Sequence, residues 1–137
     1  MTIIPNKNTM TRRELLSRTA SVGALVAIGA GFVSAPNGAW ATEVTAISEH
    51  ELATLIQMAR DIYPHDKVGD EYYVIAVKGY DTDGNKAMVS DGVAALDKLA
   101  VAAGAANYIE TKWEDNRVAL LKQMEDSGFF QAVRGGL

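Results

Sequence analysis

His65 and Asp66 are adjacent, and they are the residues of this sequence best suited to acid–base chemistry. An imidazole titrates near neutral pH, and a nearby carboxylate can orient it or share its proton. Both residues follow Pro64 in a polar stretch, where adjacent side chains on a loop rarely face one another. The sequence therefore favours a solvated pair and keeps catalysis by His65 and Asp66 as the alternative.

His50 stands between Glu49 and Glu51, which are side-chain types that can bind a metal ion. The three residues lie where a helix is predicted to begin. Carboxylates in a first helical turn are explained by capping and by the helix dipole. We therefore expect no metal site around His50.

The segment Asp81-Thr82-Asp83-Gly84-Asn85 alternates acidic and amide residues as the start of a calcium-binding loop does. The pattern fails at its sixth position, where Lys86 replaces the required glycine. It fails again at the twelfth, where Gly92 replaces the bidentate glutamate. The segment is predicted to be a plain turn.

Among its 137 residues the chain has no cysteine and two histidines. This composition excludes disulfides, thiolate zinc sites, iron–sulfur clusters and thioether-linked haem. The sequence thus predicts no catalytic residue, no metal site and no cofactor-binding site in this chain.

The amino-terminal part has the pattern of a twin-arginine export signal. Arg12 and Arg13 follow a threonine and precede Leu15 and Leu16 after one variable residue. A mild apolar run over 20–33 follows, broken by glycines and shorter than the roughly 20 apolar residues of a membrane-spanning helix. Rival interpretations are a general secretory signal, an uncleaved anchor and an ordinary amphipathic helix.

Ala39 and Ala41 supply the small residues of an A-x-A cleavage site. The prediction is a signal peptide over 1–41 and export to the periplasm. Twin-arginine export carries folded proteins, often with a cofactor bound. A chain without evident cofactor ligands would use this route if its partner carries the cofactor, or if the domain folds too fast for export of the unfolded chain.

Cleavage after Ala41 would leave residues 42–137 as one small domain. The leader holds four basic residues and one acidic residue, which leaves nine basic and 16 acidic residues and a net charge of −7. An acidic domain without a basic cluster is a poor candidate for binding nucleic acid. A basic surface on a partner protein remains compatible with this charge.

Hydrophobic periodicity predicts an all-α domain, a small irregular helical bundle. A capping box at Ser48 opens the first helix, which Pro64 ends. A strand is the competing interpretation over 71–80, because its residue types also favour sheets. The remaining helices are expected over 86–103, 113–125 and from 129 onward.

Two segments resemble a known family. One is the run from Leu52 to Asp66, which contains Asp61-Ile62-Tyr63-Pro64. The other is the segment 127–134, which has a Phe-Phe-x-x-Val-Arg pattern. The chain is similar to the small subunits of bacterial FAD-dependent sugar and polyol dehydrogenases. These are the gluconate 2-dehydrogenase subunit 3 family and the related sorbitol, fructose and glucose dehydrogenase subunits. Similar proteins continue past the position of Leu137, so two interpretations are open: the domain is incomplete at its carboxyl end, or the partner supplies the missing packing.

The resemblance implies a non-catalytic accessory subunit. Its large partner subunit would bind FAD and oxidise the sugar or alcohol, and the twin-arginine translocase would export the two together. The location implied is the periplasm, with peripheral attachment to the inner membrane through the complex. The sequence leaves open which sugar is oxidised and whether a cytochrome c subunit takes part.

Aromatic residues are numerous for so small a domain, which cannot bury all of them, and aromatic residues are enriched at interfaces. Some of them are therefore expected to contact the partner, the rest to lie in the core. A stand-alone periplasmic ligand-binding protein or a small enzyme using His65 and Asp66 is the alternative. The candidate partner contacts are Tyr63, Pro64, Tyr72, Tyr73, Trp113, Phe129 and Phe130.

Overall fold

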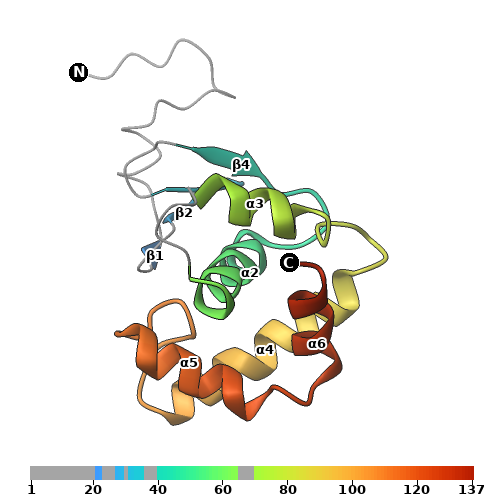
Figure 1. Cartoon of the computed structure of the whole chain (residues 1–137). Helices are drawn as coiled ribbons and strands as arrows, with labels where there is room; N and C mark the ends of the chain where they lie inside the picture. Colours follow the sequence, from blue (N-terminus) through green and yellow to red (C-terminus); the bar gives the residue numbers. More distant parts are fainter. Residues whose placement is uncertain (1–20, 23–26, 30, 36–39, 65–69) are drawn as a thin grey trace, which may run out of the picture.

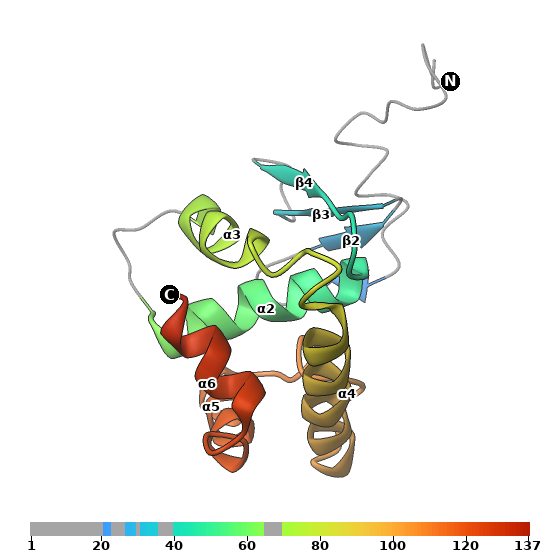
Figure 2. The same ribbon diagram turned by 90° about the vertical axis from the view of Figure 1, so that its right-hand side faces the viewer.

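The fold is arranged around one central helix, α2 (Glu49–Ile62). A small antiparallel sheet and α3 lie on one side of α2, and α4, α5 and α6 lie on the other (Figures 1 and 2). The computed structural model describes residues 21–22, 27–29, 31–35, 40–64 and 70–137.

Five helices and a four-stranded sheet make up the described chain. The all-α prediction is confirmed as a mostly helical fold, with the short sheet as an addition to it. No helix among the described residues is both long enough and apolar enough to cross a membrane. The other elements are β1 (Ser21–Val22), β2 (Ala27–Gly29), β3 (Phe32–Ser34), β4 (Ala41–Glu43), α3 (Asp70–Lys78), α4 (Lys86–Ala102), α5 (Glu114–Gln123) and α6 (Gly128–Gly135).

The predicted capping box opens α2. Ser48 Oγ accepts a hydrogen bond from the N–H of Glu51 at 3.1 Å, and the N–H of Ser48 donates to Glu51 Oε1 at 2.8 Å. The helix ends at Ile62, two residues before Pro64. Residues 52–59 are all buried, although the periodicity predicts only one apolar face. A helix buried on every side needs cover from two layers, and here the sheet supplies the second.

Close packing of α4 against α6 depends on Gly92. A Cβ at this position would lie 2.1 Å from Cγ of Phe129, so the aromatic ring occupies the space that a side chain would need. The absence of a side chain at Gly92 thus lets α6 approach α4 closely. Gly104, just after α4, has a φ of +98°, a conformation that glycine adopts readily at the end of a helix.

Residues that the sequence assigns to the leader form most of the sheet. The strand order is β1-β2-β3-β4, and every neighbouring pair is antiparallel. Ile28 and Val33 belong to the hydrophobic core, and β2 and β3 contact α2. Sequence reasoning, which set residues 1–41 apart from the fold, did not foresee this layer. Strands of two or three residues are too short to show the alternating pattern from which strands are recognised.

Candidate functional site

Asp61 and Arg117 form a buried ion pair between the end of α2 and α5. Arg117 Nε lies 2.8 Å from Asp61 Oδ2, and Arg117 Nη2 lies 3.3 Å from Oδ1. Arg117 Nη1 also donates to the carbonyl of Thr111 at 3.1 Å. A buried charge is tolerated when it is paired and hydrogen-bonded, and both charges here meet that condition.

Two further side chains complete the coordination of Asp61. The Tyr108 hydroxyl donates to Asp61 Oδ2, and Gln57 Nε2 donates to Oδ1 at 3.3 Å. Burial raises the pKa of Tyr108 well above its ordinary value, and the negative charge of Asp61 raises it further. The phenol therefore stays protonated as a donor, and the cluster connects α2, α5 and the connector between α4 and α5. The contacts within the cluster hold these elements of the fold together.

His50 contacts a carboxylate on another helix. His50 Nε2 lies 2.5 Å from Asp97 Oδ2, and Asp97 Oδ1 accepts the backbone N–H of Tyr108 at 3.0 Å. The hydrogen bond to Asp97 raises the pKa of His50, against the opposing effect of burial; the charges of Asp97, Glu51 and Glu110 raise it further. This pair fastens α2 to α4. Among the described residues, no group of His, Asp and Glu side chains is placed to hold a metal ion.

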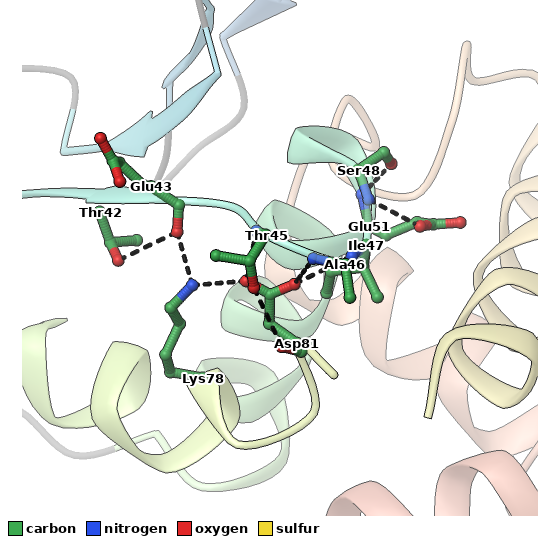
Figure 3. Close-up of polar contacts among 9 residues, drawn as sticks. All are labelled: Thr42, Glu43, Thr45, Ala46, Ile47, Ser48, Glu51, Lys78 and Asp81. Atoms are coloured by element: carbon green, nitrogen blue, oxygen red, sulfur yellow. Dashed lines mark hydrogen bonds and ion pairs between the residues drawn. The ribbon is translucent and has the colours of Figure 1, made fainter. Parts of the chain in front are cut away.

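Asp81 binds the segment of chain that enters α2 (Figure 3). Asp81 Oδ1 accepts the N–H groups of Ala46 and Ile47 at 2.7 and 2.9 Å, and Oδ2 accepts that of Thr45 at 2.8 Å. Lys78 Nζ lies 2.5 Å from Oδ2. Burial alone would raise the pKa of Asp81, but Lys78 and the three N–H groups hold that pKa well below its usual range. Asp81 is thus bound within the fold, and residues 83–85 form a turn.

Large apolar side chains on the surface form a different kind of candidate site. Tyr72 and Ile75 on α3 are 66% and 73% exposed, and Trp113 is 76% exposed. Residues three apart on a helix share a face, so Tyr72 and Ile75 form one apolar patch, the α3 patch. Tyr73 and Val77, on the opposite side of α3, are buried. The α3 patch is therefore apolar surface that the described fold leaves in contact with water.

Trp113 combines exposure with an unfavourable backbone. Its φ of 71° lies in the left-handed region, where it is the one non-glycine residue among those described. It occupies the amino-terminal cap of α5 and makes no side-chain capping bond. Bulky residues adopt this conformation at a cost of about 1–3 kcal/mol and are found in it mostly at functional sites.

Three hollows in the described surface lie beside predicted contact residues. Trp113 lines one of about 760 Å³ between the end of α4 and α5, with Leu120 at its base. Phe130 lines another of about 380 Å³ beside α5, and Tyr63 lines a third of about 330 Å³ near α6. Each hollow is open to solvent and places an aromatic ring within reach of a second molecule.

The structure divides the predicted partner contacts into surface and core residues. Tyr63, Pro64, Tyr72 and Trp113 are exposed, and Phe130 is half-buried. Tyr73 and Phe129 are a correction, because both rings are 6% exposed and pack in the core. Tyr73 lies across α3 from the patch, and Phe129 fills the space above Gly92; neither is available to a partner in this conformation.

Other predicted site residues fall outside the described part of the chain, apart from Ala41. Ala41 is exposed at the start of β4, where it is paired with Ser34 of β3. The residues outside the described ranges are Arg12, Arg13, Leu15, Leu16, Ala39, His65 and Asp66.

Sequence reasoning missed Ile75 as a surface residue and Asp61 as the centre of a buried cluster. The exposure of Ile75 could have been predicted from helical spacing, because Ile75 lies one turn after Tyr72 on the same face. The Asp61 cluster was not, because its partners Tyr108 and Arg117 lie 47 and 56 residues further along the chain. Comparisons with models of protein families, with curated proteins and with solved structures give no match to this chain.

Proposed function

We propose that this chain is a non-catalytic accessory subunit that binds a FAD-dependent sugar or alcohol dehydrogenase and directs its twin-arginine export to the periplasm. The observation that carries the proposal is the α3 patch, Tyr72 and Ile75, on a domain whose other apolar side chains are largely buried. Large exposed apolar side chains on a small domain are typical of a surface that another protein covers.

The use of the ionisable groups supports a binding role. Asp61, Asp81 and Asp97 each accept hydrogen bonds from at least two groups of the fold. A general acid or base must keep an atom free for the substrate's proton. These carboxylates use their oxygens to hold helices and connectors together.

Trp113 supports the same role from a second place on the surface. An exposed tryptophan contributes little to the stability of its own domain, whereas tryptophans in interfaces are among the side chains that contribute most to binding. Its strained φ of 71° keeps this ring at the edge of the hollow between α4 and α5. The α3 patch and Trp113 are the contact residues of the proposal.

The direct test is recovery of a flavoprotein with the tagged full-length chain from the cells that encode it. Absorbance at the flavin bands and mass spectrometry of the eluate would identify the partner. Substituting Tyr72→Ser and Ile75→Ser together should reduce its recovery at least about tenfold, because truncating the few anchor side chains of an interface costs about 2 kcal/mol or more each. Val101→Ser on α4 is the matched control, since Val101 is also exposed, at 59%.

A monomeric, colourless protein recovered equally from wild type and double variant would refute the accessory-subunit proposal. Activity abolished by His65→Ala would then favour the stand-alone enzyme. Retention of the flavoprotein in the cytoplasm after Arg12→Lys and Arg13→Lys substitution would support the export role, because the arginine pair is the defining element of this signal.

A further inference from the structure

The peptide bond between Ala41 and Thr42, where the signal peptide is predicted to be cut, lies inside strand β4. Ala41 is paired with Ser34, and Thr42 with Val33, both in β3. Recognition by strand addition binds an extended segment through its backbone and its alternate side chains. In this fold β3 already occupies one edge of the segment that the peptidase must bind.

Trp40, the residue before Ala41, is also held. Trp40 packs against the core, and its carbonyl accepts the N–H of Ala35 at 3.0 Å. The leader strands β1, β2 and β3, with Ile28 and Val33 in the core, lie between solvent and α2. Access to the bond from this edge therefore requires separation of β3 from β4.

The segments before and after the Ala41–Thr42 bond are held in the fold by different kinds of contact. On the carboxyl side, Asp81 accepts the N–H groups of three successive residues beginning at Thr45, and Lys78 Nζ donates to the carbonyl of Glu43 at 2.6 Å (Figure 3). These bonds join the start of the mature chain to the end of α3. None of these bonds involves a residue of the leader strands.

The leader side has poorly satisfied polar atoms. Ser34 Oγ and Trp40 Nε1 are buried without a hydrogen-bond partner among the described residues. Such groups lose their hydration without compensation, which favours states in which they are exposed again. Gln57 Oε1 on α2 is a third such atom in the described part of the chain, so two of the three lie on the leader side, whereas the charged groups of Asp81 and Lys78 bind the backbone on the mature side.

We propose that the leader strands form a detachable cover over α2, and that this cover must open before the bond after Ala41 can be cut. The inference rests on the proposed function in one respect, the identity of residues 1–41 as an export signal. The cover makes processing depend on a conformational opening of the folded chain, which a partner that binds near α2 could promote.

The test uses a reversible disulfide that joins β3 to β4 in the full-length chain. Phe32 and Glu43 are register partners, and the bond from the N–H of Val44 to the carbonyl of Gly31 makes theirs a non-hydrogen-bonded pair, whose Cα spacing suits a disulfide. Because the chain has no other cysteine, Phe32→Cys with Glu43→Cys creates one crosslink. The reduced form of the same protein is the matched control.

Two measurements report the opening of the cover. Hydrogen exchange should show the amides of β3 and β4 exchanging at least about tenfold faster than those of α2 in the reduced form, and slowing on oxidation. Purified signal peptidase in detergent should release residues 42–137 from the reduced form at least about tenfold faster than from the oxidised form, since cleavage follows the open population. Both samples are reduced before mass spectrometry.

A second variant tests the opposite direction. Val33→Asp places a charge in the core beneath the cover, where it favours the open state, and should speed cleavage above the wild-type rate. Equal cleavage of the oxidised and reduced forms, with no gain in Val33→Asp, would overturn the cover while leaving the export signal intact. A bond after Ala41 that resists the peptidase even in the urea-unfolded chain would refute the export-signal proposal itself, and the cover with it.

Discussion

At the residue scale, the acidic side chains hold the fold together through specific partners. Asp61 combines two contacts to Arg117 with hydrogen bonds from Tyr108 and Gln57. Its carboxylate is fully buried, so the cost of desolvation is offset only while all of these partners remain. The aspartate of the Asp-Ile-Tyr-Pro segment is thus used for stability.

The substitution Asp61→Asn should lower the free energy of unfolding by about 3–5 kcal/mol, because it leaves the guanidinium of Arg117 buried without a counter-charge. Urea denaturation followed by circular dichroism would measure the change. The double variant Asp61→Asn with Arg117→Met should recover much of the loss. Asp91→Asn, at an exposed position of α4, should change stability by less than about 0.5 kcal/mol. A loss in Asp61→Asn no larger than this control would contradict the assignment.

The contact between His50 and Asp97 makes stability depend on pH. The pKa of His50 is raised from its ordinary value of 6.5, chiefly by the hydrogen bond to Asp97. The folded chain therefore binds this proton more tightly than the unfolded chain. The stabilisation is complete below pH 6.5 and is lost as the pH rises through the folded pKa.

Denaturation curves across this range should show stability falling toward alkaline pH in the wild type. The fall should be reduced in His50→Gln, where the titrating group is gone, and retained in His65→Gln, which removes the other histidine. Identical profiles for wild type and His50→Gln would show that the imidazolium does not contribute. Asp97→Asn offers an independent check, because it removes the main cause of the raised pKa.

At the element scale, each helix is positioned by one or two specific contacts as well as by its apolar face. Gly92 lets the ring of Phe129 sit directly on α4, and Ser127 caps α6 by accepting the N–H of Phe130 at 3.1 Å. Tyr80 extends the same contact region, since its hydroxyl donates to the carbonyl of Ala132 at 2.5 Å. The last helix is thereby fixed at both of its ends.

Gly92→Ala should destabilise the protein by about 1–3 kcal/mol, because the new Cβ would overlap the ring of Phe129 and force it to move. This cost exceeds the roughly 1 kcal/mol that alanine gains over glycine within a helix. Thermal denaturation would measure the difference. Gly128→Ala is the matched control, since a Cβ there would have no neighbour within 4 Å, and it should be neutral or slightly stabilising. Adding Phe129→Leu to Gly92→Ala should restore part of the loss.

Trp113 combines a backbone conformation that disfavours the start of α5 with a side chain that the fold leaves exposed. Its left-handed backbone weakens the start of α5, and its exposed ring contributes little packing. Trp113→Gly should therefore leave the free energy of unfolding unchanged or raise it by up to about 1 kcal/mol, because glycine adopts this φ without strain. The same variant should weaken recovery of the flavoprotein partner.

Trp113→Ala separates the two effects, since it removes the ring and keeps the backbone strain. Both variants should bind the partner equally poorly while differing in stability. A glycine variant less stable than the alanine variant would show that the backbone at position 113 is not strained.

At the scale of the whole molecule, α2 is enclosed between two layers of unequal strength. The helical layer packs through large side chains and contains the Asp61 cluster, whereas the sheet consists of strands of only two or three residues. The hydrophobic core nevertheless runs through both layers, from Val33 to Val133. Loss of the sheet would expose α2 without removing the contacts among the helices.

Hydrogen exchange across the native protein should reveal this asymmetry. Amides of residues 52–59 should exchange slowest, because α2 is buried on all sides, and those of β2 and β3 should exchange fastest among the paired backbone groups. Mass spectrometry of peptic fragments over a series of labelling times would resolve the two sets. Uniform protection across sheet and helices would indicate one cooperative unit.

Features that depend on neighbours along the chain could be predicted from the amino-acid sequence. The capping box at Ser48, the stop before Pro64, the cap at Ser127 and the break at Gly104 are of this kind, because hydrogen bonds and backbone preferences act over three or four residues. The spacing of apolar residues likewise predicted the helices that the structure contains.

Contacts between distant residues were established only by tertiary packing. Asp61 contacts Tyr108 and Arg117, and Tyr73 turns inward while Tyr72 stays in water, because burial is settled between elements far apart in the sequence. The leader strands show the same limit. Their residues carry an export pattern that predicts a segment separate from the domain, yet burial against α2 gives them a place in its core. Local patterns specify elements, whereas the exclusion of water from shared surfaces specifies their partners.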